Sequence, residues 1–251
     1  MKNRTESNTF ATEKDVLYQV SLLQGLTNGD YDGTVTLGEL KQHGDTGIGT
    51  FDRLNGEMIL LDGRVYRAAG DGSVELAPDE ETTPFCVAAF MGANAVKDLR
   101  DIPDCDALYD KLDRVAEERG KNRFYMIRID GMFREMCVRS VHGQQEPYRR
   151  LVDVLTREQT LFHYENIEGT LVGLYCPPYM SALNAVGWHL HFLSKDKTKG
   201  GHMLGVNVED AVLTWKDLNA FEVRLPQGER FSGFDLTVDQ SADIEKVEKN
   251  T

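Results

Sequence analysis

Short apolar segments separated by turn-forming residues run through most of this chain, and they predict many strands and few helices. We expect strands at 57–61, 64–67, 84–91, 124–129, 133–141, 170–176, 211–215 and 221–225. We expect helices at 36–40, 104–119, 147–156 and 241–248. The apolar pairs within 16–23 fit a strand or a helix equally well, so that stretch stays open.

Local signals mark where several of these elements begin or turn. Thr36 followed by Glu39 forms a capping box that predicts a helix start. Pro147 suits the first turn of the helix at 147–156, where its missing N–H costs nothing. Asp62-Gly63 predicts a tight hairpin between its flanking strands, and Asp130-Gly131 predicts a turn between 124–129 and 133–141.

The mixture of many strands with scattered helices predicts an α+β protein built from two packed mixed β-sheets with a few peripheral helices. Residues 1–14 are polar and predict a flexible N-terminal arm. We place a boundary near 147–156, between a β-rich half at 15–146 and a second half at 147–251 that carries the metal ligands. The two halves are expected to share one core if they form a single compact unit.

The charge and composition exclude several classes of partner. A net charge of −13 over 251 residues, with a pI near 4.9, argues against nucleic acid as a partner. No apolar run approaches the length of a membrane span, and the N-terminus lacks the apolar core of a secretory signal. Four widely spaced cysteines are typical of reduced thiols, and together these features predict a cytoplasmic protein.

Three of the six histidines fall within fourteen residues, and they are the strongest chemical signal in the chain. His189 and His191 have strand spacing, so their side chains are expected on one face. The polar segment 194–201 can fold back and bring His202 opposite them. Three converging imidazoles suit a divalent transition metal, zinc first, so we expect a metal site on this β-hairpin with a coordination position left open.

Two other stretches carry candidate site residues. The glycine-rich stretch 44–51 leads into a strand pattern, which argues against a phosphate loop and favours close backbone contact. Glu57 follows it and is either a catalytic carboxylate or an exposed charge at a strand end. Arg139, at the end of an alternating strand, can clamp a carboxylate or simply face outward. The isolated His43 and His163 are expected to be structural or exposed, as is His142.

Several motifs in this order and spacing resemble the α-acetolactate decarboxylase family, from about Leu17 to Glu248. The matching stretches are Tyr31-Asp32-Gly33, His43-Gly44-Asp45, Gly47-Ile48-Gly49-Thr50-Phe51, Asn55-Gly56-Glu57, Thr83-Pro84-Phe85, Pro147-Tyr148, Glu168-Gly169-Thr170-Leu171-Val172-Gly173, His189-Leu190-His191-Phe192 and Gly200-Gly201-His202. The resemblance implies conversion of (S)-2-acetolactate to (R)-acetoin and carbon dioxide, in a homodimer.

The resemblance also implies a set of site residues. Zinc would be held by His189, His191 and His202, and the remaining active-site residues would be Glu57, Thr50, Arg139 and Glu248. The metal would draw charge from the ketone and hydroxyl oxygens as carbon dioxide leaves, which stabilises an enediolate. A glutamate would then deliver a proton to one face of the carbon.

Two other classes of protein remain open from the residues alone. One is a three-His iron or manganese oxygenase of the β-barrel type, although no carboxylate follows the His-x-His pair on its strand. The other is a zinc-stabilised binding module, whose site would be closed by a fourth ligand such as Cys176 and which would unfold without zinc.

Overall fold

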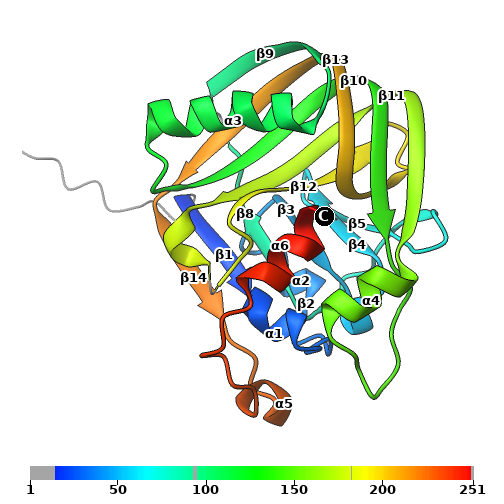
Figure 1. Ribbon diagram of the computed structural model, residues 1–251, viewed down its shortest axis with the longest axis vertical. Coiled ribbons are helices and arrows are strands. Elements are labelled where there is room, and N and C mark those ends of the chain that lie inside the picture. The colour runs from blue at the N-terminus through cyan, green and yellow to red at the C-terminus, as the bar shows by residue number, and fades with distance from the viewer. Residues whose placement is uncertain (1–14, 93–94, 182, 250–251) are drawn as a thin grey trace, which may run out of the picture.

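A computed structural model describes residues 15–92, 95–181 and 183–249 of the chain (Figure 1). The predicted arm at 1–14 lies outside the described residues. The strands are β1 (Val16–Val20), β2 (Val35–Thr36), β3 (Thr46–Thr50), β4 (Glu57–Leu61), β5 (Arg64–Ala68), β6 (Val74–Leu76), β7 (Thr82–Thr83), β8 (Cys86–Ala89), β9 (Ala95–Ile102), β10 (Phe124–Ser140), β11 (Thr160–Cys176), β12 (Gly187–Ser194), β13 (Gly200–Leu218) and β14 (Ala220–Arg224).

The helices are short, except for one that covers a sheet. They are α1 (Leu23–Thr27), α2 (Leu37–Leu40), α3 (Cys105–Arg119), α4 (Leu151–Glu158), α5 (Glu229–Ser232) and α6 (Ser241–Lys249), with 3-10 turns η2 (Asp52–Leu54) and η3 (Pro178–Met180). In the described part of the chain, no helix combines the length and apolar character needed to cross a membrane.

Two large sheets form the body of the protein. The seven-stranded sheet has the order β14-β1-β8-β3-β4-β5-β6, and it is mixed because β1 and β14 run parallel. The five-stranded sheet has the order β10-β11-β12-β13-β9 and is antiparallel throughout. Because β10 also pairs with β13, four of its strands close into a ring. The predicted α+β class with two packed sheets is confirmed.

Apolar side chains from both sheets meet in a shared core. Ile48 and Ile59 of the seven-stranded sheet pack in one cluster with Val172 and Leu193 of the five-stranded sheet. The other face of the five-stranded sheet is covered by α3, along the outside of the molecule in Figure 1. Three helices, α1, α4 and α6, gather beside the sheets and pack on one another. Residues of these three helices line one pocket together with residues near the ends of β3, β10 and β12.

Many local predictions are confirmed. The hairpin through Asp62-Gly63 forms as β4 and β5, and the helix predicted at 104–119 forms as α3 with Asp104 as its N-cap. The Thr36 hydroxyl accepts a hydrogen bond from the N–H of Glu39, as the capping signal predicts. The open stretch at 16–23 contains strand β1 followed by the first residue of α1.

Two local predictions are wrong. Asp130 and Gly131 form no turn, because β10 runs unbroken through them and pairs on both sides. A Cβ on residue 131 would lie 2.3 Å from the carbonyl oxygen of Asp210, so the glycine serves close strand packing there. The helix predicted from Pro147 begins at Leu151 instead, so the proline lies before the helix.

Candidate metal centre and its pocket

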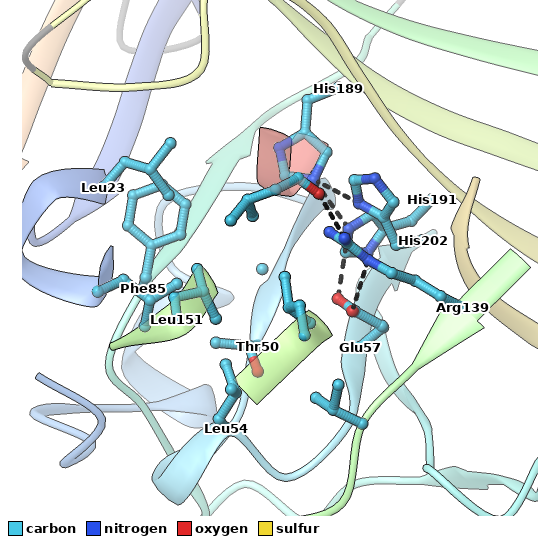
Figure 2. Close-up of a pocket in the computed structure, with 15 residues that line it drawn as sticks. Leu23, Thr50, Leu54, Glu57, Phe85, Arg139, Leu151, His189, His191 and His202 are labelled. Carbon is cyan, nitrogen blue, oxygen red and sulfur yellow. Dashed lines mark hydrogen bonds and ion pairs between the residues drawn. The ribbon is translucent and has the colours of Figure 1, made fainter. Parts of the chain in front are cut away.

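The three clustered histidines meet where β12 and β13 pair. His191 and His202 are direct cross-strand partners, and both side chains are almost fully buried. His189 lies two residues before His191 on the same face of β12, as its spacing predicts. Figure 2 shows the three rings turned toward one another at one end of a pocket. The hairpin predicted from the sequence therefore brings all three imidazoles together.

The distances between these rings suit a single ion. His189 Nε2 lies 3.1 Å from His191 Nε2 and 3.1 Å from His202 Nδ1. One candidate donor atom from each ring lies within 4.8 Å of the other two. Two nitrogens that bind one tetrahedral zinc at about 2.0–2.1 Å lie roughly 3.3 Å apart, close to the observed separation. The donor set therefore fits a divalent metal with a position left open for substrate.

The protonation of the rings also fits metal binding, which requires neutral imidazole. Burial, with Arg139 as the second cause, lowers the pKa of His189 to about 3. Burial likewise holds the pKa of His191 well below its usual value, with smaller effects from His189 and Arg139. His191 Nδ1 lies 2.8 Å from the carbonyl oxygen of Met58, which can only accept, so the proton is on Nδ1 and Nε2 faces the cluster.

Glu57 and Thr50 come from the other sheet and reach the same pocket. They face each other across the β3–β4 pair. Glu57 is 8% exposed, and its Oε2 lies 3.6 Å from His191 Nε2, so it is a buried neighbour of the histidines and not a surface charge. The Thr50 hydroxyl donates to the carbonyl oxygen of Gly56 over 2.8 Å, which ties the two strand ends together.

Arg139 adds a buried positive charge to the group. It pairs with His202 across β10 and β13 and is 4% exposed. Its Nε lies 3.9 Å from Glu57 Oε1, and its Nη1 donates to the carbonyl oxygen of Val247 in α6. The outward-facing alternative for Arg139 is therefore wrong. Glu248 follows Val247 in α6, and its side chain lies outside the described residues.

The remaining histidines and cysteines stay out of this group, as expected. His43 stacks on Tyr18 with ring centroids 3.8 Å apart, and His163 lies 3.9 Å from Cys137 on the neighbouring strand. All four cysteines are free, and burial raises the pKa of Cys176 to about 12. Among the described residues, the group that could hold a metal here consists of the three histidines. Cys176 is not part of it.

The rest of the pocket is an apolar wall that the sequence did not reveal. It is lined by Leu23, Leu26, Leu54, Phe85, Val141, Leu151, Leu155 and Val247. These residues come from α1, α4, α6 and η2 and from positions next to β8 and β10, and all of them belong to one apolar cluster. In the sequence, each of these residues has the context of an ordinary core residue. The site thus has a polar end that can hold oxygens and an apolar end that excludes water.

Comparisons with known proteins show which family this chain is similar to. Residues 17–238 match the family model described as Alpha-acetolactate decarboxylase. An Alpha-acetolactate decarboxylase of Methanosarcina mazei is 39% identical over 94% of this chain and 81% of its own length. One from Bacillus licheniformis is 35% identical over 94% of this chain and 92% of its own length.

Solved structures are similar to this chain in their fold. The crystal structure of alpha-acetolactate decarboxylase from Bacillus subtilis strain 168 superposes with a TM-score of 0.89 at 33% identity, covering 93% of this chain and 99% of that one. A protein similar to the same enzyme from Staphylococcus aureus superposes with a TM-score of 0.86 at 30% identity, covering 93% of this chain and 100% of that one. With most of its length matched in sequence and in fold, the chain belongs to the alpha-acetolactate decarboxylase family.

Proposed function

We propose that this protein decarboxylates (S)-2-acetolactate to (R)-acetoin at a zinc ion held by His189, His191 and His202. Its family makes it a carboxy-lyase that acts on acetolactate. The observation that carries the zinc site is the buried three-His group, with Glu57 and Arg139 beside it in one pocket. Among the described residues, this group contains three histidines and no fourth His or Cys. That composition supports an open, reactive site over a closed structural one.

The substrate has features that match the polar end of the pocket. 2-Acetolactate is a β-keto acid with a hydroxyl beside its ketone, so two neighbouring oxygens can face the histidines. Bound there, a zinc ion supplies Lewis acidity that withdraws charge from these oxygens. Histidine ligands bring no negative charge, so none of them offsets the charge of the ion. Among the described residues that line the pocket, the Glu57 carboxylate and the Arg139 guanidinium are the charged groups beside it.

Arg139 and Glu57 are assigned different roles. The buried guanidinium of Arg139 binds and orients the substrate carboxylate. When the bond to carbon dioxide breaks, its electron pair stays on the substrate and the carbon must gain a proton. Glu57, or Glu248 from α6, delivers that proton from one side, which gives a single enantiomer. Thr50 fixes the strand end that carries this side of the pocket, through its bond to the carbonyl of Gly56.

The charge of the whole protein works against this substrate at long range. With a net charge of −13, the surface repels an anion. At physiological ionic strength that repulsion is screened beyond about 8 Å. Arg139 and the three histidines line one pocket, so a zinc ion held there would add its positive charge to that of Arg139 within this range, and local attraction would govern binding.

The function is tested by incubating zinc-loaded protein with racemic 2-acetolactate and separating the acetoin by chiral chromatography. Fast formation of one enantiomer, lost after treatment with a chelator and regained with zinc, is the expected result. Acetoin at background level with zinc demonstrably bound would contradict it. Iron content and oxygen uptake in the same samples test the oxygenase alternative, which family membership does not favour.

We extend the proposal to the state of the protein in the cell. Four free cysteines, two of them buried, support a reducing compartment such as the cytoplasm. The family resemblance supports a homodimer, which sedimentation velocity tests directly. A monomer at working concentration would contradict that part while leaving the chemistry intact.

A further inference from the structure

The turn between β3 and β4 contains two consecutive residues in the left-handed backbone region. Arg53 and Leu54 both have a φ of 59°, a conformation that side chains larger than glycine rarely adopt. Such strain persists only where surrounding structure fixes it, and it concentrates at functional sites. This turn begins after Thr50 and ends before Glu57, two residues of the polar end of the pocket.

Hydrogen bonds hold this turn from several sides. The N–H of Arg53 donates to the carbonyl oxygen of Tyr31 over 2.7 Å, and the N–H of Leu54 donates to that of Phe51 over 2.9 Å. The carbonyl oxygen of Arg53 in turn accepts from the N–H of Gln144 over 2.7 Å. The chain before β2 and the chain after β10 therefore both fix the backbone at 53 and 54.

The effect of this strained turn is to place the side chain of Leu54 in the pocket. It is 4% exposed and lines the cavity together with Leu151 and Leu155 of α4. Figure 2 shows Leu54 at the opposite end of the pocket from His189, with Thr50 between them. A molecule whose oxygens lie at the histidines therefore points its alkyl groups toward Leu54.

We propose that Leu54 is a specificity-determining residue that limits the size of the alkyl groups on the substrate. This inference rests on the proposed function, because it takes the substrate oxygens to be held at the histidines. The ligand class is 2-hydroxy-3-keto acids, and Leu54 favours the acid with a methyl group on its hydroxyl-bearing carbon over homologues with ethyl or larger groups. One methylene in an apolar pocket changes relative specificity by about 10-fold or more.

The test compares kcat/KM for 2-acetolactate with kcat/KM for the homologue that carries ethyl in place of that methyl. Leu54→Ala is expected to shift the ratio at least about tenfold toward the ethyl homologue. Leu54→Gly is the second variant, because glycine removes the side chain and also suits the positive φ, so its fold is under less strain. Circular dichroism and zinc content confirm that each variant is folded and loaded.

Arg53→Gly is the matched control. Arg53 has the same φ, but its side chain is 64% exposed and does not line this pocket, so the ratio is expected to stay at the wild-type value. An unchanged ratio in the folded Leu54 variants, or an equal shift in Arg53→Gly, would overturn the role of Leu54 alone. Wild-type protein inactive on both acids would instead overturn the proposed function and this inference with it.

Discussion

His191 donates its Nδ1 proton to the carbonyl oxygen of Met58 across 2.8 Å, and this bond joins the two sheets at the candidate metal centre. His191 belongs to β12 of the five-stranded sheet, and Met58 belongs to β4 of the seven-stranded sheet. Because the bond fixes the ring and its tautomer, Nε2 faces the other histidines before any metal binds. The same strand β4 carries Glu57, so one strand positions both a candidate ligand and the carboxylate beside it.

This preorganised set predicts that losing one ligand removes the metal. His202→Ala should bind less than one zinc per chain and lose activity by more than about 100-fold, beyond the usual effect of losing an outer-shell partner. Metal analysis by mass spectrometry and an acetoin assay measure both. His163→Ala, which changes an exposed histidine on β11, is the control and should keep both properties. Full zinc content with normal turnover in His202→Ala would exclude it as a ligand.

Removal of the metal should abolish the activity of the protein without unfolding it. Strand β12, which carries two of the histidines, also carries Leu190, Phe192 and Leu193, which are buried in cores that need no metal. After chelation we expect a lower Tm but an intact cooperative transition, because bound metal adds stability only by mass action. Thermal melts by circular dichroism, with and without chelator, check this. Loss of the far-UV signal at 25 °C would instead indicate a zinc-stabilised binding module.

Glu57→Gln should keep the shape of the site and remove its proton transfer. The carboxylate is 8% exposed beside His191, and an amide of the same size can occupy the same space. We expect kcat to fall by about 10²–10⁴-fold, the usual contribution of a general acid or base, with zinc still bound. Glu165→Gln, at an exposed position of β11, is the control and should be unaffected. Near-normal turnover by zinc-loaded Glu57→Gln would assign the proton to another group.

The polar end of the pocket was predictable because its signals are local. The strand spacing of His189 and His191 and the turn before His202 were enough to predict the ligand hairpin. Glu57 and Arg139 lie at predicted strand ends, where a charged residue is either part of a site or simply exposed, so the sequence made them candidates without deciding between the two. The family motifs, more than periodicity, selected the catalytic interpretation, and burial in the structure agrees with it.

The apolar end could not be predicted because it exists only in the folded chain. Leu23, Leu54, Leu151 and Val247 come from distant segments, and each has the sequence context of an ordinary core residue. The carbonyl of Met58 is a backbone group, so its hydrogen bond with His191 cannot be predicted from residue types. The continuity of β10 was missed because a local signal was misleading. Its Asp-Gly pair is a strong turn signal, but pairing with strands on both sides overrides it.

The glycine-rich stretch predicts a large stability effect for Gly47→Ala. β3 lies between β4 and β8, and a Cβ on residue 47 would lie 2.1 Å from the carbonyl oxygen of Val87. That oxygen belongs to the backbone of a strand paired on both sides, so it cannot move aside without breaking the sheet. We expect a loss on the order of 3 kcal/mol or more in the free energy of unfolding.

Urea unfolding of zinc-loaded protein measures this loss, and Gly228→Ala serves as the control. A Cβ on residue 228 meets no atom within 4 Å, and its φ of −74° suits any residue, so stability should change by less than about 1 kcal/mol. Because β3 ends in Thr50, the Gly47 variant should also lose activity at a lower temperature than the control. Equal unfolding midpoints for the two variants would show that β3 and β8 can separate at no cost, against the packing described for them.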